Sequence, residues 1–278
     1  GGARGSLAYD PAMSRFTRAL VRLPASTFAQ GLTEAGLGPP DLELALAQHA
    51  AYCEALASAG LEVIRLPPAP EFPDSTFVED AAILTPRGAI LTRPGAPSRA
   101  GEVEGIAAAL SALGVDALRL EGPGHVDGGD VCEAEGEVLI GLSSRTDPAG
   151  VEALTRALAG LGMPATTIDV RGRGPALLHL KTGLAYVGEG RVVVDRALAD
   201  EPALAAYERI VVGPAEAHAA NCVRVGDRVL MPTGAPRLVD ALIALGLAVQ
   251  LLEISEFRKM DGGLSCLSLR WPEGLAGG

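Results

Sequence analysis

The sequence predicts an α/β protein in which about five ββαβ units close into a ring. Two short apolar runs joined by a glycine-containing turn recur four times, and a stretch rich in Ala and Leu with helical spacing follows each pair. The pairs begin 53, 54 and 38 residues apart, and five equal units of a 278-residue chain would hold roughly 56 residues each. An ordinary doubly wound parallel sheet would give the same alternation and is the alternative fold.

Hairpins and helices are predicted in the same order in every unit. The apolar runs are rich in Val, Ile and Leu, and they predict hairpins over 77–84 with 89–92, 130–133 with 137–142, 184–187 with 191–194, and 222–225 with 228–231. The Ala and Leu spacing predicts amphipathic helices over 101–113, 148–161, 196–209 and 235–245. Each helix leads toward a further short strand, such as 247–252.

The fifth unit requires the two ends of the chain to pair. The apolar run 264–271 has no hairpin partner nearby, and neither has the run 16–23. Their pairing would close the ring and remove exposed sheet edges. The sequence therefore predicts one domain over residues 1–278, a closed five-bladed α/β propeller with its core over about 16–271.

Composition argues against several classes of partner. Lys and Arg number 23 and Asp and Glu number 34, which gives a net charge of −11. A surface this negative repels nucleic-acid backbones and anionic lipids. The longest apolar stretch, 238–252, is shorter than the roughly 20 residues of a membrane span. Neither nucleic acid nor a membrane is an expected partner.

The four cysteines have neither CxxC spacing nor the density of a disulfide scaffold. The first residues lack the features of a secretory signal, so a cytoplasmic location is the expectation. In a reducing compartment, Cys53, Cys132 and Cys222 are interpreted as small buried hydrophobic residues. Cys266 differs because two glycines deliver it to the start of an apolar run, where a packed side chain is the favoured interpretation from the pattern alone and a nucleophile is the alternative.

A cysteine nucleophile needs a base, and the chain has four histidines. His179 lies in an apolar run, as either a core histidine or a catalytic one. His125 and Asp127 share one face if their segment is extended, which makes them a competing acid/base pair, although Asp-Gly sequences also form simple turns. His49 and His218 are interpreted as packed or surface residues.

Charged side chains next to the predicted hairpins suit a ligand that carries both charges. The segment 72–80 carries three carboxylates, Asp74, Glu79 and Asp80; the adjacent pair Glu79 and Asp80 would accept the N–H groups of a guanidinium if it faces a pocket, or else the charges are solvated at a strand end. Arg99 and Arg145 each lie in a loop after a hairpin and would bind a carboxylate, or else they are surface arginines. No dinucleotide or P-loop pattern and no local set of metal ligands occurs.

Seven segments in order resemble the motifs of the dimethylarginine dimethylaminohydrolases, which belong to the guanidine-modifying (pentein) superfamily. The resemblance extends from about residue 16 to residue 270. It implies the same ring of five ββαβ units around a central active-site channel. The segments are Phe77-Val78-Glu79-Asp80, 92–99, Asp127-Gly128-Gly129-Asp130-Val131, Gly141-Leu142-Ser143 with Arg145-Thr146, His179-Leu180-Lys181, Ala219-Ala220-Asn221-Cys222, and Asp261-Gly262 with Cys266.

The resemblance also implies roles for ten residues. Cys266 would be the nucleophile, His179 the general acid/base and Asp127 the carboxylate that orients the imidazole. Glu79, Asp80 and Asp261 would hold the guanidinium. The remaining binding residues would be Asp74 at the substrate ammonium, Arg99 and Arg145 at its carboxylate, and Leu32 in a lid loop over residues 30–38.

The implied reaction converts a methylated arginine and water into citrulline and a methylamine through a thiouronium on Cys266. It requires no metal or organic cofactor, and the family's rings occur as monomers and as homodimers. Ser265, Gly263 and Thr182 depart from the family's common residues, which affects the expected pocket shape and the preference between methylated and free arginine.

Three alternatives share part of this pattern. An arginine deiminase uses the same cysteine chemistry on free arginine, but such enzymes usually carry an extra helical module for which 278 residues leave no room. An amidinotransferase shares the thiouronium and also tends to be longer. A non-catalytic protein that captures arginine derivatives is the alternative outside the enzymes, and intact Cys266, His179 and Asp127 argue against it.

Overall fold

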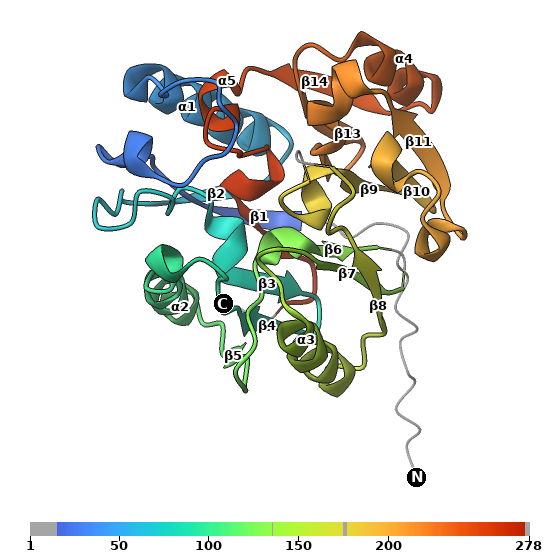
Figure 1. The fold of residues 1–278 in the computed structure, drawn as a ribbon. Coiled ribbons are helices and arrows are strands. Elements are labelled where there is room, and N and C mark those ends of the chain that lie inside the picture. Colours follow the sequence, from blue (N-terminus) through green and yellow to red (C-terminus); the bar gives the residue numbers. More distant parts are fainter. Residues whose placement is uncertain (1–15, 135, 175–176, 276–278) are drawn as a thin grey trace.

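Five three-stranded sheets stand around a common centre, and the longer helices lie outside them (Figure 1). The computed structural model describes residues 16–134, 136–174 and 177–275. In every sheet the middle strand pairs antiparallel with one neighbour and parallel with the other. Within the described residues this is the predicted ring of five ββαβ units, and the doubly wound sheet is excluded.

The strands follow one another around the ring in chain order. The sheets are β15 (Leu269–Pro272), β1 (Phe16–Arg22) and β2 (Glu62–Leu66); β3 (Ala82–Thr85), β4 (Gly88–Leu91) and β5 (Ala117–Arg119); β6 (Val131–Glu133), β7 (Val138–Leu142) and β8 (Ala165–Asp169); β9 (Leu184–Gly188), β10 (Arg191–Asp195) and β11 (Glu208–Val212); and β12 (Val223–Val225), β13 (Arg228–Pro232) and β14 (Ala248–Leu252).

The two ends of the described chain close the ring. β1 pairs antiparallel with β15, with Ala19 opposite Arg270 and Leu20 opposite Leu269. The predicted pairing of 16–23 with 264–271 is thus confirmed, although only the last part of the second run is a strand. Residues 265–267 form a short 3-10 helix instead, η10 (Ser265–Leu267).

Four units cross from the second strand to the third through an α-helix that ends in the same way. The helices are α1 (Leu42–Ser58), α2 (Glu102–Ala112), α3 (Pro148–Gly160) and α4 (Pro236–Ala244). A glycine with positive φ follows each, at positions 60, 114, 162 and 246. The next residue's N–H then bonds back to a helix carbonyl five residues earlier, as from Leu247 to Leu242. This glycine cap lets the chain turn directly into the third strand.

The helix predicted over 196–209 does not form. That segment holds two 3-10 turns, η7 (Arg196–Leu198) and η8 (Pro202–Leu204), before β11 begins. Pro202 cannot donate a helical hydrogen bond, and the Asp195 and Glu201 side chains each accept an N–H two residues ahead, which starts a new turn. The helix was predicted from the Ala and Leu content, which carries no information about these local side-chain caps.

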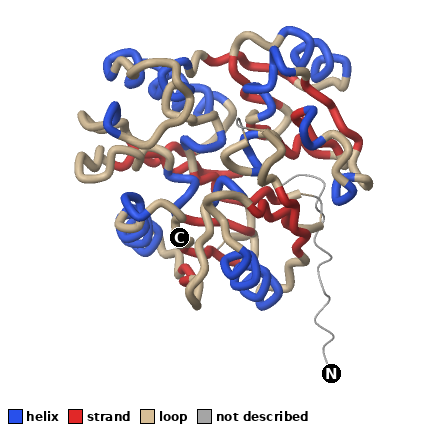
Figure 2. The backbone as a smooth tube through the Cα atoms, viewed as in Figure 1, coloured by secondary structure: helices blue, strands red, loops and turns tan. Residues whose placement is uncertain are grey.

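Short 3-10 turns replace the beginnings of three predicted strands: η3 (Val78–Ala81), η5 (Gly128–Asp130) and η10. Two further turns, η6 (Leu180–Thr182) and η9 (Pro214–Ala220), lie just before the predicted strands of their units, so one such turn comes before the first strand of each sheet. Figure 2 shows short helical turns near the middle of the ring, with strands around them. The hairpin turn predicted at 135–136 includes Glu135, which lies outside the described residues.

The apolar core is divided into five clusters, each shared by neighbouring units. One joins Leu110 of α2 to Trp271 of β15, and another joins Leu139 of β7 to Leu184 of β9. Burial between units fixes each blade relative to the next, so the centre of the ring is held rigidly.

Of the helices described, none has both the length and the apolarity to cross a membrane. The last α-helix of the described chain, α5 (Ser255–Arg258), is short and leads to the segment that carries Cys266.

Candidate active site

The five 3-10 turns contact one another in sequence at the centre of the ring. Each unit thereby supplies one polar residue in or next to its turn: Asp80 in η3, Asp127 before η5, His179 before η6, Asn221 after η9 and Cys266 in η10. A short chain segment that enters a buried strand is a rigid support for such a side chain. The repeated fold thus gathers residues that lie as far as 186 positions apart.

Cys266 is the partly exposed cysteine of the four, and the other three are buried. The chain reaches it through a tight bend, in which Asp261 has a φ of 57° and Gly262 lies against the Phe77 ring. A Cβ at Gly262 would lie 2.2 Å from a carbon of that ring, so only glycine fits. The bend aims the sulfur at the pocket, and the Gly263 N–H lies 3.5 Å from it.

The surroundings of the sulfur hold a proton on it in the resting protein. Burial raises the pKa of the Cys266 thiol to about 12, and the carboxylates of Glu79 and Asp80 act in the same direction. The Gly263 N–H and the Lys181 ammonium oppose them. A cationic group placed beside the sulfur would lower this pKa. The site therefore suits a nucleophile that is activated when a cation binds.

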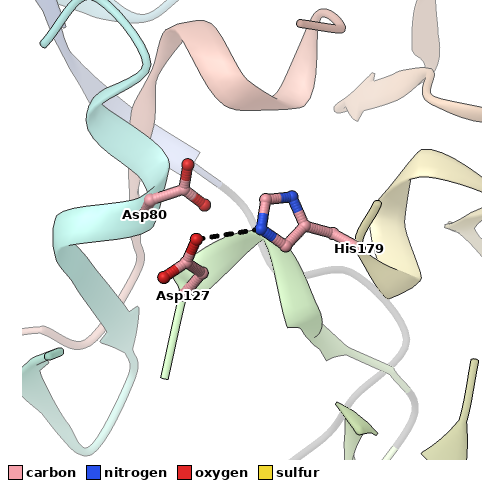
Figure 3. Close-up of side chains that lie close together, drawn as sticks. All are labelled: Asp80, Asp127 and His179. Carbon is pink, nitrogen blue, oxygen red and sulfur yellow. Dashed lines mark hydrogen bonds and ion pairs between the residues drawn. The ribbon is translucent and has the colours of Figure 1, made fainter. Parts of the chain in front are cut away.

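His179 and Asp127 form a buried pair. His179 Nε2 lies 3.0 Å from Asp127 Oδ2, and Asp80 lies beside both (Figure 3). The second Asp127 oxygen accepts the Gly95 N–H at 2.7 Å. The Thr182 hydroxyl accepts the His179 N–H at 3.2 Å and fixes the start of η6. The contact with Asp127 fixes the imidazole ring, and the bond to Thr182 fixes the backbone of His179. A general acid/base needs a fixed position of this kind.

The charges around His179 keep it protonated at neutral pH. Burial alone would lower its pKa, but Asp80, Asp130 and Asp127 raise the pKa of His179 to about 9. Burial also opposes ionisation of Asp127, yet the His179 cation, Arg99 and the Gly95 N–H hold the pKa of Asp127 below its usual value. The pair therefore stabilises the fold most between the ordinary pKa values of the two groups, 3.8 for Asp127 and 6.5 for His179. That contribution is lost as pH rises through about 9, or as pH falls through the lowered pKa of Asp127.

Arg99 lies at the wall of the pocket, but its donors are committed to the protein. Its Nε and Nη2 donate to Glu102, its Nη1 donates to Asp80, and Nη2 also reaches the Phe77 carbonyl at 3.0 Å. The guanidinium is buried with both carboxylates. Even with this partner, burial raises the pKa of Glu102 to about 7. Arg99 thus fixes Asp80 in place, and the roles predicted for Arg99 and Arg145 at a substrate carboxylate stay predictions.

Replacing Arg99 with leucine is expected to destabilise the fold strongly, because Asp80 and Glu102 would remain buried without their cation. The expected loss is about 3–5 kcal/mol in the free energy of unfolding, measured by urea denaturation. Arg119→Leu is the matched control, since it removes an arginine from an exposed pair with Glu104 and should leave stability nearly unchanged. Equal stability of the two variants would contradict this assignment of Arg99.

Asp74 and Asp261 connect the pocket to the predicted lid loop. Both carboxylate oxygens of Asp74 lie 3.1–3.2 Å from the Leu32 N–H, and Asp261 accepts the Glu34 N–H at 2.6 Å. Burial raises the pKa of Asp74, while Arg99, the Leu32 N–H and Arg145 oppose the rise. The lid therefore lies over the site in this structure, with Leu32 still 43% exposed.

One pocket contains nine of the ten residues predicted for the site. Its lining includes Leu32, Asp74, Asp80, Arg99, Asp127, Arg145, His179, Asp261 and Cys266. Phe77, Leu178, Met260 and Gly262 complete the lining and were not predicted, although each stands within three residues of a predicted one. Acidic groups lie near the sulfur, and Arg145 lies near Asp74. The pocket therefore offers opposite charges at different places, as a ligand with several charged groups requires.

Glu79 is the predicted residue that does not line this pocket. It borders a cavity of about 140 Å³ on the other side of η3, with Lys181, Ser265 and Arg270. Its oxygens accept the Ser265 hydroxyl at 2.8 Å, Lys181 at 2.7 Å and Arg270 at 3.1 Å. These contacts tie η3 to the cysteine turn, to η6 and to β15, respectively. Glu79 thus supports the nucleophile turn from behind, and its charge still acts on the sulfur.

The competing histidines lie elsewhere. His125 Nδ1 is 3.1 Å from Asp147, and both side chains are more than 40% exposed. The structure thus pairs Asp127 with His179, and the predicted pairing of His125 with Asp127 does not occur. His49 lies 3.6 Å from Cys53 Sγ inside the core, and burial lowers the pKa of His49 to about 4. His218 donates through Nε2 to the Thr233 carbonyl at 2.8 Å.

One group of described residues has the geometry of a metal site. Ligand atoms of Asp80, Asp127 and His179 lie within 4.8 Å of one another, and all three side chains are buried. Their atoms already have partners: Arg99 and the Gly129 N–H bind Asp80, and the Gly95 N–H and His179 bind Asp127. The arginine places a fixed positive charge at the same carboxylates. These contacts favour proton transfer and cation binding over a metal ion.

The sequence is similar to two curated hydrolases over nearly its whole length. It is 39% identical to the N(G),N(G)-dimethylarginine dimethylaminohydrolase of Pseudomonas aeruginosa, over 92% of this chain and 100% of that protein. It is 37% identical to the protein of the same name from Streptomyces coelicolor, over 92% of this chain and 97% of that protein. The chain belongs to the dimethylarginine dimethylaminohydrolase family. A family model described as "Arginine deiminase" also matches residues 69–226.

Solved structures of the dimethylarginine dimethylaminohydrolase family have the same fold. A cysteine-to-serine variant of the Pseudomonas aeruginosa enzyme, complexed with citrulline, has a TM-score of 0.88 and 38% identity, covering 92% of this chain and 100% of that one. A histidine-to-glycine variant solved as an adduct with S-methyl-L-thiocitrulline has the same values. The N-terminal domain of the cyanobacterial arginine dihydrolase ArgZ has a TM-score of 0.81 at 20% identity, which indicates a shared fold. The predicted pentein propeller is confirmed.

Proposed function

We propose that this protein hydrolyses Nω-methylated arginine to citrulline and a methylamine, with Cys266 as the nucleophile. The observation that carries the proposal is the single pocket that contains Cys266, the His179–Asp127 pair and charged groups of both signs. Family membership agrees with it, because relatives at 37–39% identity have the name of this activity. A chain of this family with its nucleophile, acid/base and substrate-binding residues in one pocket is a hydrolase.

The substrate guanidinium would lie between the cysteine and the carboxylates. Asp80 and Asp261 would accept its N–H groups, while Asp74 and Arg145 would bind the ammonium and carboxylate of its amino-acid end. The charge of Arg145 already acts on Asp74, so the two groups lie near each other, as the α-substituents of an amino acid require. Binding places a cation beside the Cys266 sulfur, which lowers the thiol pKa so that its proton is lost to solvent.

The reaction then proceeds in two halves. The Cys266 thiolate attacks the guanidinium carbon, and protonated His179 donates its proton to the departing dimethylamine as the C–N bond breaks. A cationic thiouronium remains on Cys266 and His179 is neutral. His179 takes a proton from water, and the resulting hydroxide attacks the same carbon. Collapse releases citrulline and the thiolate, and the hydroxyl proton of the intermediate passes to solvent.

The substrate assay distinguishes the proposal from its nearest alternative. Purified protein is incubated separately with asymmetric dimethylarginine, monomethylarginine and free arginine, and citrulline and released amine are quantified together. The proposal predicts equal amounts of citrulline and methylamines from the methylated substrates. Turnover of free arginine alone would assign a deiminase, which the match of residues 69–226 to the arginine deiminase model favours as the second candidate. Absence of turnover with all three would contradict both.

Replacing Arg145 with alanine is expected to weaken substrate binding more than it slows chemistry. Arg145 lies in the loop after β7 and lines the pocket, but no reacting atom of the proposed mechanism belongs to it. KM should rise by about tenfold to a hundredfold with a smaller change in kcat, measured by steady-state kinetics. Arg145→Lys retains the charge without the guanidinium fork and should give an intermediate KM. A fall in kcat at unchanged KM would contradict this role.

A further inference from the structure

Asn221 lies next to the turn of the one unit that has no role in the proposed reaction. The turns of the other four units carry Asp80, Asp127, His179 and Cys266, and each has a function in the mechanism above. Asn221 follows η9 in the unit of β12, β13 and β14 and is 6% exposed. It lies in the segment Ala219-Ala220-Asn221-Cys222, which resembled a family motif without suggesting a role.

The Asn221 amide contacts the nucleophile turn at two points. Its Oδ1 accepts the Ser265 backbone N–H at 2.9 Å, and its Nδ2 lies 3.9 Å from Cys266 Sγ as a donor. The Gly263 backbone N–H is a second donor to the same sulfur, at 3.5 Å. The Asn221 side chain therefore binds the residue before Cys266 through its oxygen, and it directs its own N–H at the Cys266 sulfur. A planar amide with an acceptor and a donor on one carbon is suited to both contacts.

We propose that Asn221 is a positioning residue that fixes the cysteine turn and, together with the Gly263 N–H, stabilises the Cys266 thiolate by hydrogen bonding. The inference rests on the proposed function, because a thiolate is needed only if Cys266 reacts. It goes beyond that function by assigning to the unit of β12, β13 and β14 a part in preparing the nucleophile. Two N–H donors at a developing anion act as an oxyanion hole does, here for sulfur.

The charges around the sulfur explain why such donors matter. Glu79 and Asp80 of η3 act on the sulfur directly, and Asp127 and Asp261 line the same pocket. Lys181 of η6 opposes the two carboxylates, and protonated His179, Arg99 and Arg145 also line the pocket. Burial and the charges of Glu79 and Asp80 outweigh the opposing cation, so the thiolate is disfavoured until substrate binds. Neutral N–H donors stabilise the anion without repelling a cationic substrate.

Gly263 is fitted to Asn221. A Cβ at residue 263 would lie 2.3 Å from Asn221 Cγ and 2.6 Å from Nδ2, closer than real atoms approach. The positive-φ glycines do not include Gly263, so alanine is compatible with its backbone, and the three atoms nearest to such a Cβ all belong to the Asn221 amide. The glycine therefore leaves the space in which the amide reaches the sulfur. Gly263→Ala should displace Asn221 and reproduce its loss.

The test compares Asn221→Asp with Asn221→Ala. Aspartate retains an oxygen for the Ser265 N–H but replaces the donor to sulfur with a carboxylate oxygen, whereas alanine removes both contacts. The rate at which iodoacetamide alkylates Cys266, followed by mass spectrometry over a range of pH, should fall at least about tenfold in both variants at a fixed pH below the thiol pKa. His218→Ala, in the same turn but bonded to Thr233, is the control and should alkylate as the parent does.

Turnover and a second substitution separate positioning from folding. With methylated arginine, kcat should fall about tenfold or more in the Asn221 variants while KM changes less than about threefold. Gly263→Ala should slow alkylation in the parent but cause little further loss in Asn221→Ala, because the displaced amide is already gone. Parental alkylation rates in Asn221→Asp and Gly263→Ala would overturn the proposal, as would a defect confined to thermal stability.

The alkylation readout keeps this inference apart from the proposed function. Slower alkylation of Cys266 in the Asn221 variants supports the role of Asn221 even if the parent turns over none of the methylated substrates. Normal turnover of the parent with unchanged alkylation in every variant overturns the role of Asn221 and leaves the proposed function standing. Each outcome therefore tests either the role of Asn221 or the proposed function separately.

Discussion

Replacing Cys266 with serine is expected to abolish turnover of methylated arginine, with kcat lowered by at least about 10⁴-fold, while the substrate still binds. A serine hydroxyl ionises far less readily than a thiol, and the carboxylates of Glu79 and Asp80 that raise the thiol pKa would oppose its ionisation too. The residues assigned to the substrate's charged ends would be unaffected by the change. Citrulline formation measures turnover, and isothermal titration calorimetry measures binding.

The control for this prediction is a cysteine outside the pocket. Cys132 lies in β6 and is buried among apolar residues, so Cys132→Ala should retain turnover. Substantial activity in Cys266→Ser would contradict the covalent mechanism, because none of the other described residues that line the pocket carries a thiol or an aliphatic hydroxyl. Loss of binding together with turnover would show that the substitution had disturbed the pocket and would contradict the expected retention of binding.

Replacing His179 with glycine is expected to lower kcat by about 10³-fold or more and to separate the two halves of the reaction. His179 must protonate a departing amine and later take a proton from water. A substrate whose leaving group needs no proton, such as S-methylthiocitrulline, should still react with Cys266 as methanethiolate departs. The second half would then lack its base, so the thiouronium should accumulate. Intact-protein mass spectrometry detects it as added mass on the protein.

This expectation has a precedent and a control within the family and the chain. The histidine-to-glycine variant of a dimethylarginine dimethylaminohydrolase was solved as an adduct with S-methyl-L-thiocitrulline. His125→Gly is the control here, because His125 is exposed and paired with Asp147. It should turn over substrate as the parent does and accumulate no adduct. The reverse result, with His125 essential and His179 dispensable, would contradict the assignment of the base.

The ring could be predicted from sequence because its repeat is local. Each hairpin is two apolar runs around a turn, and four of the crossover helices end in the same glycine cap, so the pattern recurs along the chain. The unit containing residues 196–209 lacks that glycine, and Pro202 divides the segment. The helix predicted there from composition alone was therefore wrong. The closing pair of β1 and β15 followed from the two apolar runs left over.

The site could be predicted as a set of residues but not as a set of contacts. Glu79 and Asp80 are adjacent in sequence, yet the tight 3-10 turn sends them to opposite sides, Asp80 into the pocket and Glu79 toward Lys181 and Arg270. A strand would also have placed the two side chains on opposite sides, but the local sequence does not show which cations lie on each side. Likewise Arg99 was expected to meet the substrate, and only the fold brings Asp80 and Glu102 to its donors.

The central claim is that methylated arginine is hydrolysed through a covalent bond to Cys266, and a rapid acid quench tests it most directly. Parent protein is mixed with excess dimethylarginine, quenched during the first turnovers, digested and mapped by mass spectrometry. The account predicts a thiouronium on the peptide that contains Cys266, none on Cys53, Cys132 or Cys222, and release of one dimethylamine for each citrulline. Citrulline formation with the modification on another residue, or with Cys266 unmodified throughout and dispensable, would contradict it.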